Sequence, residues 1–461
     1  MLDKKDNQKR TLGSLKFNLV LMLASLSGIS IIIFASNLDF FCVPKQSRPI
    51  NISNEELFLI YSVIFSFISI FLLKLSSYLK YRKYKLRTIT FLTMLTIQLF
   101  IMSMLFIIYG QIKILSSYNS AFFYTLVYTT LTTSAVFLVI AAIQFVRWFS
   151  RGKNHIVMTY GLVMLVLCSN SIVGIIYVIE ASLSLPVTVN YKSCSVMVSA
   201  LSNPNPEAIN ILSNIYDATS FFSFVLAWVV TVLMLREYTK HKNKIIYWLI
   251  FALPLIIFLP PYEIALYYFS SNQVDSILTS INLNSNIYGY QTLNTLLDSN
   301  LQLGGAFFGM AFLTIAAKVT IDKEQKKSLI LTGIGIMFLF ASKDISSLII
   351  ASFPPLGAVS IAFMGIASYT TYVGIYNTAL LAARDKKLRS DLRAKIENNM
   401  KMLGSIASSQ DRLEIEKNVK DLMNLSGRLQ EGNDQPELTE NEIRDIVNDV
   451  IVELRRSKKE S

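Results

Sequence analysis

A lysine and an aspartate stand side by side in an apolar part of this sequence. Lys343 and Asp344 lie in "FASKDISSLIIASFPP" (340–355), toward the end of an apolar run that begins near Ser328. A charge inside such a run is unfavourable in hydrocarbon unless it meets an opposite charge or water. Neighbours on a helix point about 100° apart, so these two side chains cannot easily satisfy each other. We therefore expect Lys343 to meet an acid from another segment.

Asp217 is the best-placed acid for that role. Counting along helices, Lys343 lies about 8 Å below the outer edge of a bilayer core and Asp217 about 10 Å deep. Glu180 and Glu263 lie nearer the surface and can reach inward. The pattern predicts an outer-half polar cluster of these residues, which is either a structural ion pair or a ligand or ion site, with Asp344 and Glu263 framing a pocket open to the outside. A third alternative is that Lys343 extends its stem to the surface.

The composition places these charges in a membrane protein. The chain has 461 residues, of which 52% are hydrophobic and only 16% charged, against about 25% charged in soluble domains. The apolar residues form runs of about 20, the length that crosses a bilayer core as helix. We predict an all-α, polytopic helical bundle of about ten spans, at 17–36, 57–79, 88–109, 122–146, 157–180, 210–235, 245–268, 301–319, 328–350 and 357–381.

The lysines and arginines predict the orientation of the bundle. Clusters occur before the first predicted span and then at every second connection, whereas the alternate connections hold only Lys45, Arg48, Lys113 and Lys192. This places both termini in the cytoplasm and the connections 181–209 and 269–300 outside, in a plasma membrane. The net charge of +12 arises entirely before residue 382, so it reflects this topology and contact with the lipid bilayer, and we expect no nucleic-acid partner.

Two of the three cysteines, Cys42 and Cys194, lie in connections that we place outside. An oxidising exterior permits a disulfide between them, but the sequence does not establish that they meet. Asn51 begins an Asn-Ile-Ser triplet on the same side, which makes it a candidate glycosylation site. The glycines at 304, 305, 309, 333, 335, 357 and 365 predict close helix packing.

Residues 382–461 form the second predicted domain, a cytoplasmic tail of amphipathic helices. One apolar stripe runs from Leu388 to Ile406, and Ser408–Asp411 offers residues that cap a second helix. A capping box at Thr439–Glu442 starts a third helix. Each stripe is narrow and must be buried on something. The tail is therefore predicted to associate with itself, as in a coiled coil, or with a partner protein.

The sequence contains no motif that indicates catalysis of the kinds common in soluble enzymes. The only histidines are His155 and His241, and no nucleotide-binding loop or hydrolase motif occurs. A metal site of ordinary ligands needs more histidine, cysteine or clustered acid than this chain offers. We expect no metal and no cofactor. The threonines at 125, 129, 132 and 133 line one side of a predicted span; they either bond to their own helix or line a polar path.

The stretch "YTTYVGIYNTALLAARDKKLRSDLR" (369–393) joins the last predicted span to a basic helix without a break. Together with the acidic closing helix "LTENEIRDIVNDVIVEL" (438–454), it resembles uncharacterised polytopic membrane proteins of ammonia-oxidising archaea that end in such a tail. The resemblance covers about the last 90 residues. It implies an archaeal plasma membrane and brings no activity.

Three functions fit these features. The first is a sensor or scaffold that binds something at its outer face and docks partners through the tail. The second is a secondary transporter or channel, favoured by the span count and the intramembrane charges. The third is a membrane-embedded enzyme acting on lipid, for which only acidic residues are available. The sequence names no ligand, and catalysis is the least supported of the three.

The predicted pairing of Lys343 with Asp217 has a direct test. Lys343→Met alone should lower thermal stability by leaving Asp217 unpaired in the bundle. Lys343→Met combined with Asp217→Asn should recover much of the loss, measured as the melting temperature of the solubilised protein. A double variant no more stable than the worse single variant would show that the two side chains do not interact.

Overall fold

The computed structural model describes the chain in separate stretches. They are residues 54–77, 84–182, 188–190, 195–197, 206–239, 305, 307–316, 323–342, 350–352, 355–384, 406 and 409–410. The labelled helices are α2 (Asn54–Ser77), α3 (Tyr84–Leu115), α4 (Ser120–Gly152), α5 (His155–Ser182), α6 (Pro206–Thr239), α11 (Lys323–Ala341) and α13 (Leu356–Arg384). The strands are β1 (Ser117–Asn119), β2 (Thr188–Asn190), β3 (Ser195–Met197) and β4 (Ile350–Ser352). A shorter apolar helix covers Phe307–Ala316.

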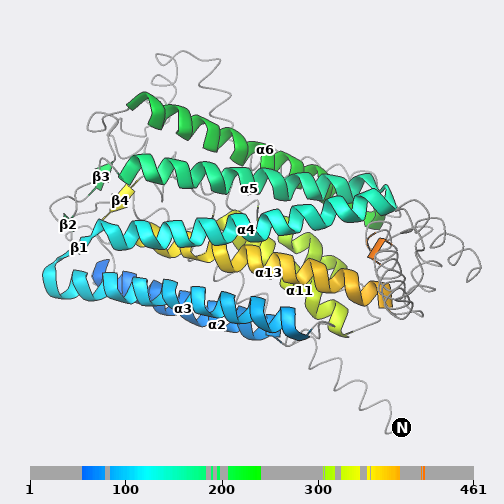
Figure 1. Cartoon of the computed structure of the whole chain (residues 1–461), viewed down its shortest axis with the longest axis horizontal. Coiled ribbons are helices and arrows are strands. Elements are labelled where there is room, and N and C mark those ends of the chain that lie inside the picture. The colour runs from blue at the N-terminus through cyan, green and yellow to red at the C-terminus, as the bar shows by residue number, and fades with distance from the viewer. Residues whose placement is uncertain are drawn as a thin grey trace, which may run out of the picture.

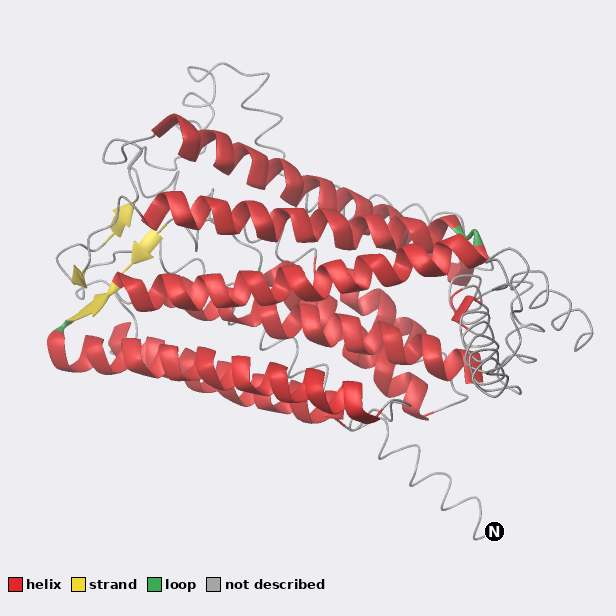
Figure 2. Ribbon diagram, viewed as in Figure 1, coloured by secondary structure: helices red, strands yellow, loops and turns green. Residues whose placement is uncertain are grey.

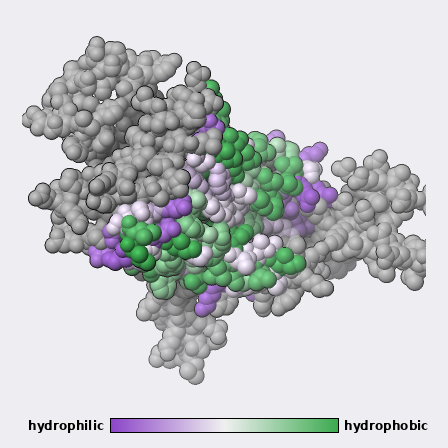
Figure 3. All heavy atoms as spheres, turned by 60° about the vertical axis from the view of Figure 1, so that its left-hand side comes forward, coloured by the Kyte–Doolittle hydropathy of each residue, from purple (hydrophilic) through white to green (hydrophobic). Residues whose placement is uncertain are grey.

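Six of these helices are long and apolar enough to cross a membrane. They contain Glu55–Ser77, Thr88–Leu115, Ser120–Arg151, His155–Glu180, Asn214–Leu233 and Leu356–Leu381. Each coincides with a predicted span, which confirms the prediction of a multi-pass, all-α membrane bundle in contact with lipid. Large apolar side chains such as Phe67 and Ile89 are exposed on its surface. Hydrophobic residues cover much of the described surface in Figure 3, and hydrophilic residues gather toward its margins.

The predicted span 328–350 is wrong at its C-terminal end. Helix α11 begins at Lys323 and ends at Ala341, and Ile350 already belongs to strand β4. The apolar run in the sequence continues past Ala341. Hydropathy alone does not show whether an apolar residue lies in a helix or in a strand, so the predicted span is too long. β-branched residues at Ile349 and Ile350 favour extended backbone, and the prolines at 354 and 355 disfavour helix in the residue before each.

Several predictions fall outside the described residues. The spans 17–36 and 245–268 are among them, and Phe307–Ala316 represents only part of the span 301–319. Of the predicted tail, the description covers the end of α13, Ile406, Ser409 and Gln410. The boundary at residue 382 therefore remains a prediction.

Helix α13 lies at the centre of the bundle. It packs against α11, α4 and α2, and α4 in turn packs against α5, which packs against α6. Figure 1 shows this succession, with α2 and α3 on one side and α6 on the other. A very tight turn joins α4 to α5: Lys153 has a left-handed backbone (φ 48°), and its N–H donates to Phe149 O at 2.8 Å. The Asn154 side chain then caps α5 by accepting from Ile156 N at 2.9 Å.

Two small ladders tie connections together at one end of the bundle. β1 pairs with β2, and β3 pairs with β4, both antiparallel, with Val196 opposite Ala351. The strands therefore bring the α3–α4, α5–α6 and α11–α13 connections to the same end, as Figure 2 shows. The alternation of basic residues in the sequence predicts that these three connections share one side of the membrane. Lys113 approaches Glu55 at 3.9 Å at this end, whereas Arg147 and Arg151 lie in the last turns of α4, at the other end.

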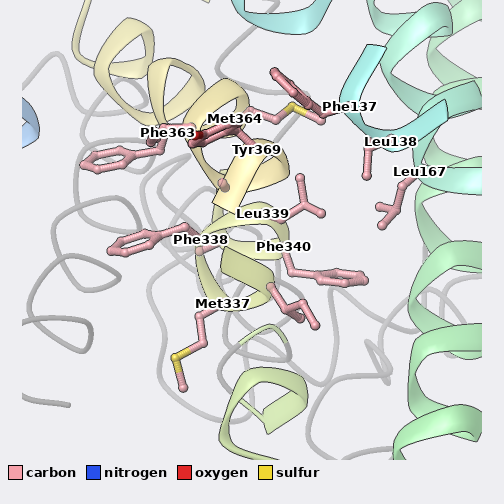
Figure 4. Packing of buried hydrophobic residues seen from close by; sticks show 14 of the residues in the cluster. Phe137, Leu138, Leu167, Met337, Phe338, Leu339, Phe340, Phe363, Met364 and Tyr369 are labelled. Atoms are coloured by element: carbon pink, nitrogen blue, oxygen red, sulfur yellow. The ribbon is translucent and has the colours of Figure 1, made fainter. Parts of the chain in front are cut away.

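Aromatic rings fill the centre between α2, α11 and α13. The Phe363 ring stacks on Phe338 with centroids 5.1 Å apart, and it meets Phe65 edge-on at 4.7 Å. Every residue from Ser328 to Ser342 is buried, so protein surrounds the apolar part of α11. Figure 4 shows Met337, Phe338, Leu339 and Phe340 of α11 beside Phe363, Met364 and Tyr369 of α13.

Glycines let α11 touch its neighbours backbone to backbone, as predicted for Gly309 and Gly333 but not for Gly374. A Cβ added at Gly374 of α13 would lie 2.7 Å from Thr332 N and 2.9 Å from Ser328 O. On the other side of α11, a Cβ added at Gly333 would lie 2.9 Å from Gly309 O. These distances leave no room for a side chain, so α11 is held between two close contacts.

Gly374→Ala should therefore destabilise the protein by about 1–3 kcal/mol, because the added methyl group must displace the α11 backbone. Thermal unfolding of the solubilised protein measures this. The matched control is Gly110→Ala in α3, where an added Cβ meets nothing within 4 Å. The control should be neutral or stabilising by about 0.5–1 kcal/mol. Equal effects of the two substitutions would contradict the close contact.

Candidate functional site

The outer-half cluster predicted from the sequence is only partly within the described residues. Lys343, Asp344 and Glu263 lie outside them, as do Cys42, Cys194 and Asn51. Asp217 belongs to α6, but its side chain is not described, and Glu180 is half-buried near the end of α5. The described part of α11 ends before Lys343, so the depth assigned to Lys343 by counting along an unbroken helix lacks support. The cluster, the disulfide and the glycosylation site stay predictions.

The predicted stripe of threonines lies on α4, where three of the hydroxyls form hydrogen bonds within their own helix. Thr125, Thr129 and Thr133 each donate to the carbonyl four residues earlier, at 2.6–2.7 Å. Thr132 is exposed at the bundle surface. Of the two interpretations, bonding within the helix is therefore the one observed for these three hydroxyls.

A site that the sequence did not indicate lies at the other end of the bundle, where the tail meets α4. The Trp148 indole Nε1–H donates to Gln410 Oε1 at 2.9 Å. The Gln144 amide donates to the same oxygen at 3.4 Å. Gln144 and Trp148 are one helical turn apart, so both donors converge on a single acceptor. Gln410 lies within the predicted capping segment Ser408–Asp411; it is helical, and its side chain makes this tertiary contact.

The three described residues of the tail segment are buried. Ile406, Ser409 and Gln410 are 2%, 1% and 8% exposed. The segment appears in Figure 1 as the short orange piece beside the ends of α4, α5 and α13, opposite the strands. We call the hydrogen bonds of Gln410 with Gln144 and Trp148, together with the buried neighbours Ile406 and Ser409, the tail seat.

Aromatic contacts connect the tail seat to the rest of the bundle. Trp148 stacks on Tyr376 of α13, with centroids 6.5 Å apart, and Tyr376 stacks on Tyr372 at 5.9 Å. On its other side, Trp148 meets Phe145 edge-on at 5.3 Å. Phe145 in turn stacks on Tyr160 of α5 at 5.9 Å. The indole that holds the tail is thereby fixed by α13, the helix from which the tail continues, and by α5.

Part of this site had a signal in the sequence. Gln144 is a carboxamide within the apolar run "VIAAIQFVRW", where a polar group needs a partner. Trp148 follows it near the end of a span, a usual place for an interfacial aromatic. Nothing in the sequence connects either residue with Gln410, which lies more than two hundred residues away.

No family model matches the chain, and searches of curated proteins and of solved structures found no match either. The resemblance to the archaeal membrane proteins thus remains an expectation.

Loss of the indole donor should loosen the tail seat. Trp148→Phe keeps an aromatic ring but leaves Gln410 Oε1, among the described contacts, with only the longer bond from Gln144. A neutral hydrogen bond contributes about 1 kcal/mol net, which corresponds to about a fivefold larger undocked population. The reporter is Ser409→Cys, a buried one-atom change, whose maleimide labelling rate in the full-length protein should rise about fivefold when Trp148→Phe is added.

The matched control is Trp228→Phe on α6, which truncates a buried indole away from the described contacts of the tail seat. It should leave the labelling rate of Ser409→Cys unchanged. Equal labelling with and without Trp148→Phe would contradict a role for the indole in holding the tail.

Proposed function

We propose that this multi-pass membrane protein is a sensor or scaffold whose membrane domain controls how its cytoplasmic tail is presented. The observation that carries the proposal is the tail seat. A buried glutamine of the tail is bonded to a buried tryptophan of α4, and that tryptophan also stacks on the helix that leads into the tail. A tail docked in this way is available to a partner only after the contact opens.

A continuous set of packed elements supports coupling between the two ends. At the strand end, β4 immediately precedes α13 and pairs with β3 in the α5–α6 connection. At the opposite end, Tyr376 of α13 stacks on Trp148. A displacement of β4 therefore acts on the same helix that carries the tail. Coupling between sites requires such a shared element with two arrangements.

In this proposal, both termini are cytoplasmic in a plasma membrane, and the strand end faces outward. The support is the alternation of basic residues, together with the gathering of three basic-poor connections at one end. The outer cluster of Lys343, Asp344, Asp217, Glu263 and Glu180 is the proposed place of ligand binding. The proposed output is association of the tail with itself or with a partner protein. A transporter would instead need this cluster to line a path, and its residues fall largely outside the described part.

The test perturbs the strand end and measures the tail. Val196→Pro removes a backbone donor and restricts φ in the middle of β3, which should break the short ladder with β4. With Ser409→Cys as reporter, we expect Val196→Pro to change the maleimide labelling rate at least threefold. Val196→Thr, which is compatible with a strand, should not change it.

Val196→Pro and Val196→Thr must first show the same cooperative thermal unfolding, so that a change in the labelling rate of Ser409→Cys reflects the tail. Ala351→Pro in β4 gives an independent break of the same ladder and should have the same effect. Unchanged labelling in folded Val196→Pro and Ala351→Pro proteins would overturn the coupling on which the proposed function depends.

A further inference from the structure

Asn170, in the middle of α5, carries a hydrogen-bonding group that the described structure leaves unused. Its side chain is fully buried, and its Nδ2 donates to Tyr216 O at 3.0 Å and to Thr219 Oγ1 at 2.9 Å, both on α6. Its Oδ1 has no hydrogen-bond partner among the described residues. A buried, unpaired amide oxygen is unfavourable by about 1–3 kcal/mol. Such groups in proteins usually bind an ordered water.

The orientation of this carboxamide is fixed by its neighbours. Rotating it by 180° would place Oδ1 against the Tyr216 carbonyl, where two acceptors would repel each other. Serine hydroxyls without a partner among the described residues, as at Ser62, Ser134 and Ser360, can still turn to a carbonyl of their own helix. Asn170 has no such freedom, so it is the group that requires a partner. Gly174, one turn further along α5, lies near both Tyr216 of α6 and Leu131 of α4, so this face of α5 is directed toward both helices.

Ser134 of α4 lies at the same level as Asn170. The antiparallel register of α4 and α5 is set by the Cys168 thiol, 3.7 Å from Ala135 O, and by Gly174, whose added Cβ would lie 3.4 Å from Leu131. Interpolation between these contacts places residue 134 opposite Asn170. Ser134 is fully buried, and its Oγ also lacks a partner among the described residues.

We propose that an ordered water molecule bridges Asn170 Oδ1 and Ser134 Oγ, joining α4, α5 and α6 in the middle of the bundle. Neither oxygen has a hydrogen-bond partner among the described residues, although both are buried at the same level of packed helices. A water molecule between them would make two hydrogen bonds of about 2.8 Å each. Water fits because it can donate to the amide oxygen and also bond to the hydroxyl. The proposal is independent of any role for the tail.

The bridge assigns a role to Asn170. Its Nδ2 holds the backbone at Tyr216, the residue before Asp217. The water holds the same carboxamide from the other side. Asn170 is thus the positioning residue for the part of α6 that carries the predicted outer-half acid.

Removing the Ser134 hydroxyl distinguishes a site that is bridged by water from one that holds no water. If water bridges the two groups, Ser134→Ala loses a hydrogen bond and should lower the melting temperature of the full-length protein by about 2 °C. In an Asn170→Leu background, the same substitution should have less than half that effect. Ser171→Ala is the matched control, because that buried hydroxyl bonds to Leu167 O of its own helix at 3.1 Å, and it should leave the melting temperature unchanged.

A high-resolution density map of the wild-type protein in lipid nanodiscs gives a second measurement that needs no variant. We expect a single peak within about 3.2 Å of both oxygens. A Ser134→Ala protein as stable as wild type, or more stable, would overturn the bridge. So would a map with no peak between the two groups, or with water bound to Asn170 alone.

Discussion

The close approach of α11 and α13 constrains the rest of this bundle. Lipid supplies no hydrophobic drive between helices, so their association depends on contact area and on how near the backbones come. Gly374 faces the Thr332 amide, and Gly335 lies where an added Cβ would come 2.7 Å from Thr371 N. Because α13 also packs against α4 and α2, the position set by these two glycines fixes where the surrounding helices can lie.

Two kinds of polar side chain play different parts in the interior. Most hydroxyls, such as those of Thr130 and Thr378, bond to carbonyls of their own helix and leave the packing of neighbours unconstrained. The carboxamides instead connect separate elements. Gln98 joins α3 to Ser69 of α2, Asn170 joins α5 to α6, and Gln410 joins the tail to α4. A carboxamide has a donor and an acceptor at fixed angles, so each such bond selects one register.

The sequence was informative where one physical property decides the outcome. Apolar runs of spanning length located the six long helices, and small residues at 309 and 333 marked a close contact. It was less informative where competing preferences are balanced. The apolar content after Ala341 is equally compatible with helix and strand, so the end of α11 and the presence of β4 were missed. The three-residue strands carry no periodicity long enough to recognise.

Contacts between distant parts of the chain were the least accessible. The Trp148–Gln410 bond depends on where the chain returns after α13, which no local pattern encodes. Gln144 could have been flagged as a buried amide in need of a partner, but not the identity of that partner. The predicted outer-half charges stay a prediction, because most of their side chains lie outside the described residues.

The pairing of β3 with β4 also has a consequence for how the protein is made. Ribosomes deliver the chain from its N-terminus, so β3 leaves the ribosome more than 150 residues ahead of its partner strand. Helices α2 to α6 are therefore synthesised before the central helix α13, against which α2 and α4 pack. The β3–β4 ladder closes only after residue 352 has been made. Its formation is a late step of biogenesis, and a chain truncated before residue 350 cannot reach it.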